Sequence, residues 1–315
     1  MWSFPSYDPS PLSAHDQEAV QAAWNALQTD PNKPLLPRAY RQRYFPGSTY
    51  KVVTAAAALD HMPELATKNY PVLRELDLPQ TNRTLPNFGG GRCGGTLPQL
   101  LRVSCNTGFG QMGLDLGAEN MAAEAEAFGF NQRPPLDLPV VAASLFPEAG
   151  EFRQNLPALA QSAIGQQDVA ASPLHMAIIA GAIGNGGVAM KPHVMAEIRD
   201  SEGELVRRYD EGEWKRFTSA ATAGAVRDMM VGVVNAGTAR GAAVPGVQVA
   251  AKTGTAQTTG DDAHAWLIAF APAEAPTVAV AVIVESQPGV SEATGGRVAA
   301  PIARAVMQAA LAAGT

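Results

Sequence analysis

The apolar residues of this chain follow a helical spacing up to about residue 190, and a strand-like spacing over much of the rest. Helices are predicted in the first part at 14–28, 48–60, 96–117, 120–130 and 172–187. We expect Ser13 to cap the first of them. In the second part the pattern predicts a hairpin at 193–209, strands at 247–257, 265–272 and 277–285, and helices at 219–235 and 296–313.

This order of elements predicts an α/β protein of the α+β type, with helices packed on an antiparallel sheet and an all-helical subdomain beside it. Only four residues separate the last two strands, a hairpin length, so these strands should pair antiparallel. The 315 residues are 46% hydrophobic, enough for a large core. We expect a single domain over 1–315, divided into an α/β subdomain (1–47 and 191–315) and a mainly helical one (48–190).

Charge and hydropathy argue against two classes of protein. The formal net charge of −6 leaves no basic footprint for a nucleic acid. No apolar run is long enough to cross a bilayer, and the N-terminus has no signal-peptide pattern. The opening WSFPSYDPSP (2–11) indicates the end of a strand followed by a Pro-rich loop. We therefore expect the chain to be a fragment whose natural beginning has been removed.

The chain has only two cysteines, Cys93 and Cys105, which are 12 residues apart. Two buried free thiols would be an ordinary arrangement. One disulfide is the other possibility, and it would place the protein outside the cytoplasm. At this point the residues leave both alternatives open.

A lysine at the start of an apolar helix is the first sign of chemistry. The segment 45–59 is FPGSTYKVVTAAAAL, and everything after Lys51 is small or apolar except one threonine. Burial of an ammonium group is costly unless the group is paired or neutral. Because Ser48 lies three residues before Lys51, on the same helix face, the amine could reach the serine hydroxyl. A helix-capping serine and a snorkelling lysine would be the simpler explanation of this pair taken alone.

Two further motifs change that interpretation, Ser104-Cys105-Asn106 and Lys252-Thr253-Gly254. Composition alone predicts about 0.25 matches to S-x-x-K, about 0.45 to S-x-N and about 0.03 to K-T-G. All three in this order have a chance probability of roughly one in a thousand. Burial, and a second positive charge such as that of Lys252, would lower the pKa of Lys51 and free its amine to take a proton from Ser48.

These three motifs are the signature of penicillin-binding proteins and class A β-lactamases. The chain resembles the transpeptidase domain of class B penicillin-binding proteins, most of all the actinobacterial penicillin-binding-protein-A group. The resemblance spans essentially the whole chain and includes SYDPSPL (6–12), YFPGSTYKVVTAAAAL (44–59), RVSCNTGF (102–109), SAIGQQDVAASPLHMA (162–177), AKTGTAQ (251–257) and HAWLIAFAP (264–272). It implies the penicillin-binding transpeptidase or β-lactamase-like fold, and a peptidoglycan D,D-transpeptidase that β-lactams inhibit covalently.

The resemblance also implies a role for each motif residue. Ser48 would attack the carbonyl between two D-alanines, and Lys51 would accept its proton. Ser104 would relay a proton toward the leaving amine, with electrostatic support from Lys252. The remaining implied contacts are those of Asn106 with the acyl amide and Lys51, of Thr253, Gly254 and Thr255 with the terminal carboxylate or a β-lactam, and of the backbone N–H groups of Ser48 and Thr255 with the oxyanion.

The implied setting is the extracytoplasmic face of a bacterial membrane, with no cofactor, no metal and an anchor absent from this chain. The implied partners are stem peptides (a D-Ala-D-Ala donor and an amine acceptor), β-lactams, and a glycan polymerase reached through regions that the chain lacks. This setting favours a Cys93–Cys105 disulfide, which would tie the GRCGG loop to the S-x-N motif. Family members carry Asn-Arg-Ala where this chain has Pro37-Arg38-Ala39, so Arg38 receives no role. Two strand segments that precede SYDPS in the family are absent, so an edge of the sheet should be missing.

A serine β-lactamase and a β-lactam sensor domain are the alternatives. A β-lactamase needs a base that activates water for deacylation, and the expected E-x-x-L-N pattern is absent around Glu148 and Glu151. We interpret those two as solvated loop charges. The gap between the S-x-N and K-T-G motifs is also long for a β-lactamase. A sensor domain also forms an acyl-enzyme with β-lactams, so this alternative is not excluded by the motifs. His264 is interpreted as a structural residue at a strand start, with Trp266 in the core.

Overall fold

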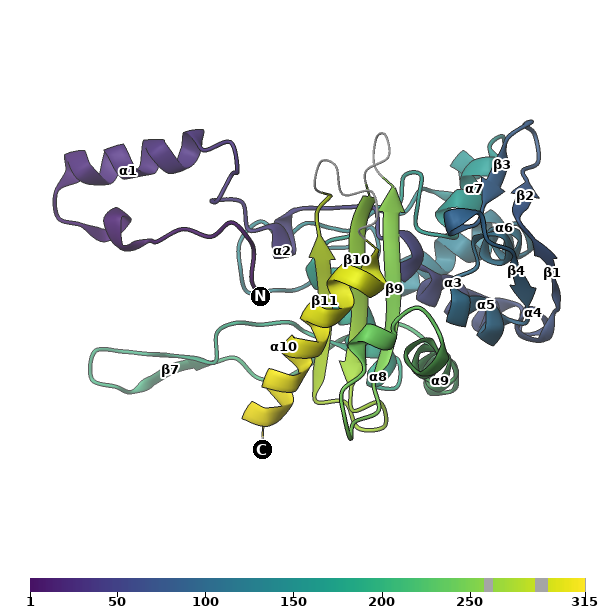
Figure 1. Ribbon diagram of the computed structural model, residues 1–315. Helices are drawn as coiled ribbons and strands as arrows, with labels where there is room; N and C mark the ends of the chain where they lie inside the picture. The colour runs from purple at the N-terminus through teal and green to yellow at the C-terminus, as the bar shows by residue number, and fades with distance from the viewer. Residues whose placement is uncertain (258–262, 287–293, 315) are drawn as a thin grey trace.

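The computed structural model describes residues 1–257, 263–286 and 294–314. An antiparallel sheet in the order β11–β10–β9 lies at its centre (Figure 1). The strands are β9 (Ala250–Gln257), β10 (Ala263–Ala271) and β11 (Val278–Val284). The middle strand is buried from Ala265 to Ala271, including Trp266, which is the pattern of a strand covered on both faces. The three predicted strands, their antiparallel pairing and the core position of Trp266 are confirmed.

Helices cover this sheet. In Figure 1, α10 (Ala300–Ala313) crosses in front of it, directly after the π-helical turn η6 (Gly295–Ala299). From behind, α8 (Pro173–Gly184) packs against β10 and β11, and α9 (Ala220–Ala236) packs against β9. Serine residues cap the N-termini of α8 and α9: the Ser172 hydroxyl accepts a hydrogen bond from the His175 N–H, and the Ser219 hydroxyl accepts one from the Thr222 N–H. The predicted helices here are confirmed.

Segment 48–190 contains most of the remaining helices, at the right of Figure 1. They are α3 (Lys51–His61), α4 (Glu64–Thr67), α5 (Leu97–Val103), α6 (Asn106–Ala127) and α7 (Leu156–Ser162). Two short antiparallel ladders lie among them, β1 (Tyr70–Leu73) with β4 (Cys93–Gly95) and β2 (Glu75–Asp77) with β3 (Thr84–Pro86). The expectation of an all-helical subdomain is therefore wrong. The division into two subdomains stays a prediction.

The break between α5 and α6 and the cap of α1 differ from the predictions. The predicted helix at 96–117 breaks after Val103, because Ser104 adopts a left-handed conformation (φ 59°), and α6 then continues across Gly117 to Ala127. At the N-terminus, Asp16 and not Ser13 caps α1 (Gln17–Thr29). A carboxylate at this position can satisfy two orphan N–H groups, those of Glu18 and Ala19, at 3.0 and 3.2 Å.

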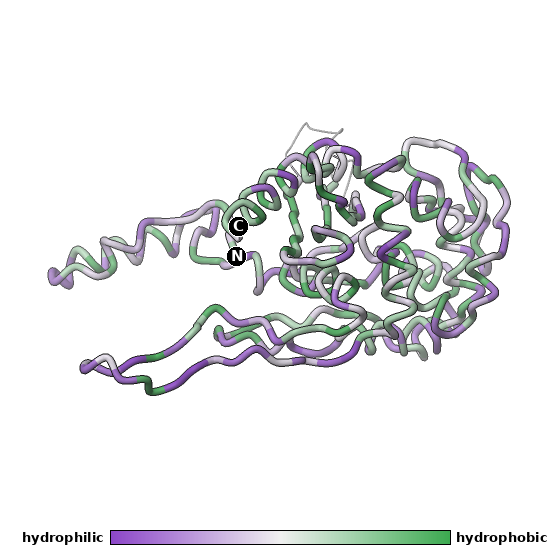
Figure 2. Tube along the Cα trace, turned by 90° about the horizontal axis from the view of Figure 1, so that it is seen from below, coloured by the Kyte–Doolittle hydropathy of each residue, from purple (hydrophilic) through white to green (hydrophobic). Residues whose placement is uncertain are grey.

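Two arms extend from the body on the same side (Figures 1 and 2). One is the N-terminal segment with the 3-10 turn η1 (Ser10–Ser13) and α1, which buries none of its residues. The other is the predicted hairpin, formed by β6 (Glu197–Arg199) and β7 (Leu205–Arg208), whose residues are all exposed. Where it meets the body, β5 (Val188–Met190) pairs with β8 (Glu213–Arg216). No helix in the described part of the chain is long and apolar enough to span a bilayer.

Candidate active site

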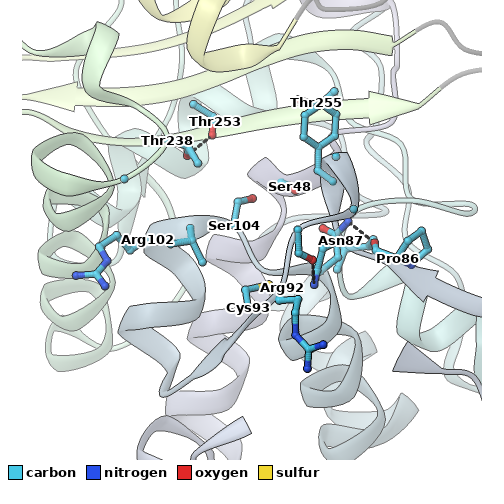
Figure 3. A pocket seen from close by; sticks show the side chains of 18 of the residues that line it. Ser48, Pro86, Asn87, Arg92, Cys93, Arg102, Ser104, Thr238, Thr253 and Thr255 are labelled. Carbon is cyan, nitrogen blue, oxygen red and sulfur yellow. Dashed lines mark hydrogen bonds between the residues drawn. The ribbon is translucent and has the colours of Figure 1, made fainter. Parts of the chain in front are cut away.

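A cleft of 1590 Å³ opens between β9 and the helical segment (Figure 3). All three motifs predicted from the sequence contribute to its wall, through Ser48, Ser104, Asn106, Thr253, Gly254 and Thr255. These residues come from positions up to two hundred apart in the chain, and the sheet edge and two helix starts bring them together. Lys51 and Lys252 lie beneath this wall and are fully buried.

Ser48 is placed by a close approach of two backbones. It lies in the 3-10 turn η2 (Gly47–Thr49), which packs against β9. Gly47 has φ +52°, and a Cβ there would come within 2.8 Å of the Thr255 carbonyl oxygen. Only glycine fits this position without strain. It sets Ser48 beside Thr255, the pair predicted to supply the oxyanion N–H groups.

The surroundings of Ser48 differ from the prediction in one respect. The α-helix begins at Lys51, so Ser48 is in the preceding turn. Its hydroxyl has no hydrogen-bond partner within the described part of the chain, whereas Lys51 donates to other groups. Apo sites often hold catalytic contacts open that tighten when a substrate is bound.

Lys51 is paired at the junction of α5 and α6. Its Nζ donates to Asn106 Oδ1 at 2.7 Å and to the Ser104 carbonyl at 2.8 Å, and it lies 3.4 Å from Ser104 Oγ. Burial, and then the nearby charge of Lys252, hold the pKa of Lys51 well below its ordinary value. A buried amine with two acceptors and a depressed pKa can be neutral near pH 7 and act as a base.

Lys252 faces the same serine from the sheet. Its Nζ donates to Ser104 Oγ at 2.8 Å and to the Thr253 carbonyl at 2.8 Å. Burial lowers the pKa of Lys252 to about 7. The Ser104 hydroxyl thus lies between two lysines, and a proton could pass through it. Two buried amines around one hydroxyl, both with lowered pKa values, make this cluster the candidate functional site of the chain.

The S-x-N wall is held from behind by the loop before α5. Cys93 and Cys105 form a disulfide, so the alternative of two free thiols is wrong. Asn106 Nδ2 donates to the Pro86 carbonyl at 3.0 Å, and Asn87 Oδ1 accepts the Thr107 N–H at 3.0 Å. The predicted tie between the GRCGG loop and this motif is therefore present. It fixes Ser104 and Asn106 against the loop.

On the sheet side, a threonine that the sequence analysis missed supports the K-T-G motif. Thr238 Oγ1 lies 2.6 Å from Thr253 Oγ1, as the dashed line in Figure 3 indicates. Thr238 follows Gly237, where an added Cβ would come within 2.2 Å of the Arg102 carbonyl oxygen. Nothing in the local sequence marks Thr238, since its contact partner is 15 residues away on β9.

Other candidate groups lie outside the cleft. Glu148 and Glu151 form a capping interaction at η4 (Ala149–Phe152) and do not line the cleft. His264 Nδ1 accepts the Ser286 N–H at 3.0 Å, and its ring packs edge-on against Tyr44. Within the described ranges, no group of three His, Cys, Asp or Glu side chains is placed to hold a metal ion.

The family follows from a comparison with known proteins. The penicillin-binding protein transpeptidase domain model matches residues 1–308. The chain belongs to this family. It spans 64% and 63% of the length of two curated relatives, and 40–48% of more distant ones.

Relatives of this transpeptidase domain agree in sequence and in fold. The chain is 41% identical over 322 residues to the peptidoglycan D,D-transpeptidase PbpA of Mycolicibacterium smegmatis, covering 99% of this chain and 64% of that protein. Penicillin-binding protein A from M. tuberculosis, solved as a ceftriaxone acyl-enzyme complex, has a TM-score of 0.91 at 40% identity over 98% of this chain and 70% of that one. The D,D-transpeptidase domain of a peptidoglycan glycosyltransferase from Eggerthella lenta has a TM-score of 0.88 at 32% identity, over 100% and 74%. The fold predicted from the motifs is therefore confirmed.

Proposed function

We propose that this chain is a peptidoglycan D,D-transpeptidase domain that works through a serine acyl-enzyme and that β-lactams inhibit covalently. The observation that carries the proposal is the position of Ser104 Oγ, 2.8 Å from Lys252 Nζ and 3.4 Å from Lys51 Nζ, in the wall that also holds Ser48. The PbpA relatives and the β-lactam acyl-enzymes of the related M. tuberculosis protein support it.

In the acylation step, the Ser48 oxygen attacks the carbonyl between two D-alanines, and neutral Lys51 takes its proton. The negative charge on the carbonyl oxygen is stabilised by the backbone N–H groups of Ser48 and Thr255. The Ser104 hydroxyl gives its proton to the leaving D-alanine nitrogen and receives the proton that Lys51 took from Ser48, while charged Lys252 polarises this hydroxyl. An ester between Ser48 and the donor peptide results, and D-alanine leaves as the amine.

Substrate is oriented by the two ends of the cleft. The Thr253 and Thr255 hydroxyls bind the terminal carboxylate across Gly254, and Asn106 binds the amide of the acyl group while it holds Lys51. In the second step, an acceptor amine attacks the ester carbonyl and gives a proton to Lys51. The bond between the acyl carbon and the Ser48 oxygen then breaks, the new amide forms, and Lys51 returns the proton to Ser48. A β-lactam opens on the same serine, and its acyl group stays attached.

The β-lactamase alternative lacks support from the cleft. Of the described residues that line it, Glu75 is the one carboxylate, and its Oε2 accepts the Thr84 hydroxyl at 3.0 Å. A β-lactamase would need a carboxylate or another base beside Ser48 to activate water. For the transpeptidase, we propose a place on the extracytoplasmic face of a bacterial membrane, with stem peptides and β-lactams as ligands and a glycan polymerase as partner.

Labelling with a fluorescent penicillin tests the proposal. A lasting adduct on Ser48, located by peptide mass mapping, is the expected result. Ser48→Ala should abolish the label and leave the melting temperature nearly unchanged, since this side chain makes no hydrogen bond within the described structure. Rapid loss of label would favour the β-lactamase, and labelling of the Ser48→Ala protein would refute the assignment. A sensor would also be labelled, but it would not join a donor peptide to an acceptor amine.

A further inference from the structure

One arm of the cleft is not used by the mechanism above. The cleft extends from Ser48 past the S-x-N wall to the loop 86–93 and strand β1. Five arginines line the whole cleft and only one acid does, within the described residues: Arg74, Arg92, Arg102, Arg240 and Arg297 against Glu75. On a chain with a formal net charge of −6, this is a local concentration of positive charge.

The loop at this arm has a rigid base. Asn87 Nδ2 donates to the carbonyls of Leu73 and Gly91 at 2.9 and 3.1 Å, and its Oδ1 accepts the Thr107 N–H. The Cys93–Cys105 disulfide fixes the end of the loop. A loop held at its base by side-chain hydrogen bonds and a covalent link can present its tip in a fixed position.

The tip presents apolar side chains to solvent. Phe88 is 61% exposed, and Val72 of the neighbouring strand β1 is 57% exposed. Both line the cleft. Exposed large apolar residues are common singly, but two of them on the wall of a binding cleft form a surface suited to an aliphatic group.

Two guanidinium groups flank this apolar surface. Arg92 Nη2 donates to the Val72 carbonyl at 3.1 Å, which holds the group beside β1. The Arg74 guanidinium lies close to Gly90, because a Cβ added to that glycine would be 3.1 Å from Arg74 Nη2. In the described structure the Arg74 guanidinium has no acidic partner within ion-pair distance, and Arg92 points away from Ser48 (Figure 3).

We propose that Phe88, Val72, Arg74 and Arg92 form a remote subsite for a peptide residue whose aliphatic side chain ends in a carboxylate. The apolar pair covers the methylene groups, and the arginines bind the carboxylate through charge-assisted hydrogen bonds. This inference rests on the proposed function, because it assigns the ligand to a stem peptide. None of these four residues contacts Ser48, Lys51 or Ser104 through a hydrogen bond in the described structure, so the subsite contributes to peptide binding and orientation and not to bond breaking.

The donor and the acceptor peptide could each supply such a residue, and the test separates them. Binding is measured by calorimetry on the Ser48→Ala protein, so that no reaction occurs. The donor probe is a pentapeptide ending in D-Ala-D-Ala with a side-chain carboxylate at its third residue. The acceptor probe has the same third residue and lacks the terminal pair. Each is compared with a twin in which that carboxylate is amidated.

Arg92→Ala and Phe88→Ala are made in the Ser48→Ala protein. Each should lower the affinity for one of the two carboxylate probes by about tenfold, the loss expected for a charged hydrogen bond or a buried aromatic contact. The amidated twin should be insensitive to Arg92→Ala. Arg83→Ala and Phe4→Ala are the matched controls, since both residues are exposed and neither lines this cleft. Circular dichroism checks that each variant is folded.

The probe that loses affinity identifies the strand that uses the subsite. Unchanged affinity of both probes in both variants would overturn the inference, and so would a loss in Arg92→Ala that is equal for the carboxylate probes and their amidated twins. The same holds if neither probe binds to the Ser48→Ala protein at all. Because penicillin labelling of Ser48 is measured separately, failure of the subsite and failure of the proposed function give different results.

Discussion

Replacement of Lys252 by methionine should remove function and, at neutral pH, add stability. The side chain is fully buried, and burial lowers its pKa to about 7 from an ordinary 10.5. The unfolded chain binds this proton more tightly than the folded chain does. Between pH 7 and 10.5, therefore, the unfolded state carries more protons, and the stability of the natural protein rises with pH. Methionine has similar length and no charge, so the variant lacks this rise.

The pKa difference sets the magnitude. At pH 7 the buried amine costs about 4 kcal/mol of unfolding free energy, and at pH 9.5 the cost is about 1 kcal/mol. Methionine also loses the hydrogen bonds to Ser104 Oγ and the Thr253 carbonyl, which is a loss of about 2–3 kcal/mol at both pH values. The variant should thus be about 1–2 kcal/mol more stable at pH 7 and about 1–2 kcal/mol less stable at pH 9.5. Removal of Lys252 also relieves its charge repulsion with Lys51, which adds to the stability of the variant where both amines would be charged.

Urea unfolding followed by tryptophan fluorescence at pH 7.0 and 9.5 measures this effect. The hydrogen-bond loss is the same at both pH values, so the change in the stability difference, about 3 kcal/mol, reports the pKa alone. Lys191→Met, at an exposed lysine, is the control and should shift stability little at either pH. A Lys252→Met difference that stays constant between the two pH values would refute the assignment of a buried amine with a lowered pKa.

Three further outcomes follow from the site. Gly47→Ala forces a Cβ to within 2.8 Å of the Thr255 carbonyl oxygen at positive φ. Such strain amounts to roughly 1–3 kcal/mol, so penicillin labelling should slow by about five- to 150-fold; Gly224→Ala, in open space on α9, should leave labelling unchanged. Thr238→Val should slow labelling about tenfold with little change in melting temperature, because it frees the Thr253 hydroxyl to rotate; unchanged labelling would contradict this role. Reduction and alkylation of the disulfide should lower the unfolding free energy by no more than about 3 kcal/mol in urea titrations, since the closed loop is short.

The motif residues could be chosen from the sequence because their chemistry lies in residue types at fixed spacing. Ser48 and Lys51, like Ser104 and Asn106, are separated by less than one helical turn, so the local sequence was enough to predict that the members of each pair lie near each other. The family resemblance, and not the local sequence, predicted that Lys252 supports Ser104. The 2.8 Å contact between Lys252 Nζ and Ser104 Oγ agrees with that prediction. The roles of these residues stay proposals.

The remaining features depend on contacts between distant segments. The helix break at Ser104 requires a left-handed residue that the apolar pattern cannot distinguish from a continuing helix. Arg38, to which no role was assigned, forms an ion pair with Glu285 at 3.3 Å and so ties the connection before α3 to the end of β11. Its partner lies almost 250 residues along the chain, and no local signal could have indicated it.

The two arms have a consequence for how the protein can change over time. Neither α1 nor the β6–β7 hairpin buries a side chain, so each can open without exposing any of the core. A substitution on an arm therefore has almost no route by which to disturb the cleft. The structure therefore places few constraints on the sequence of the arms, while the sheet edge and the helix junction around Ser104 leave little room for change. One chain thus combines a tightly constrained reaction centre with two surfaces whose sequence the fold leaves open.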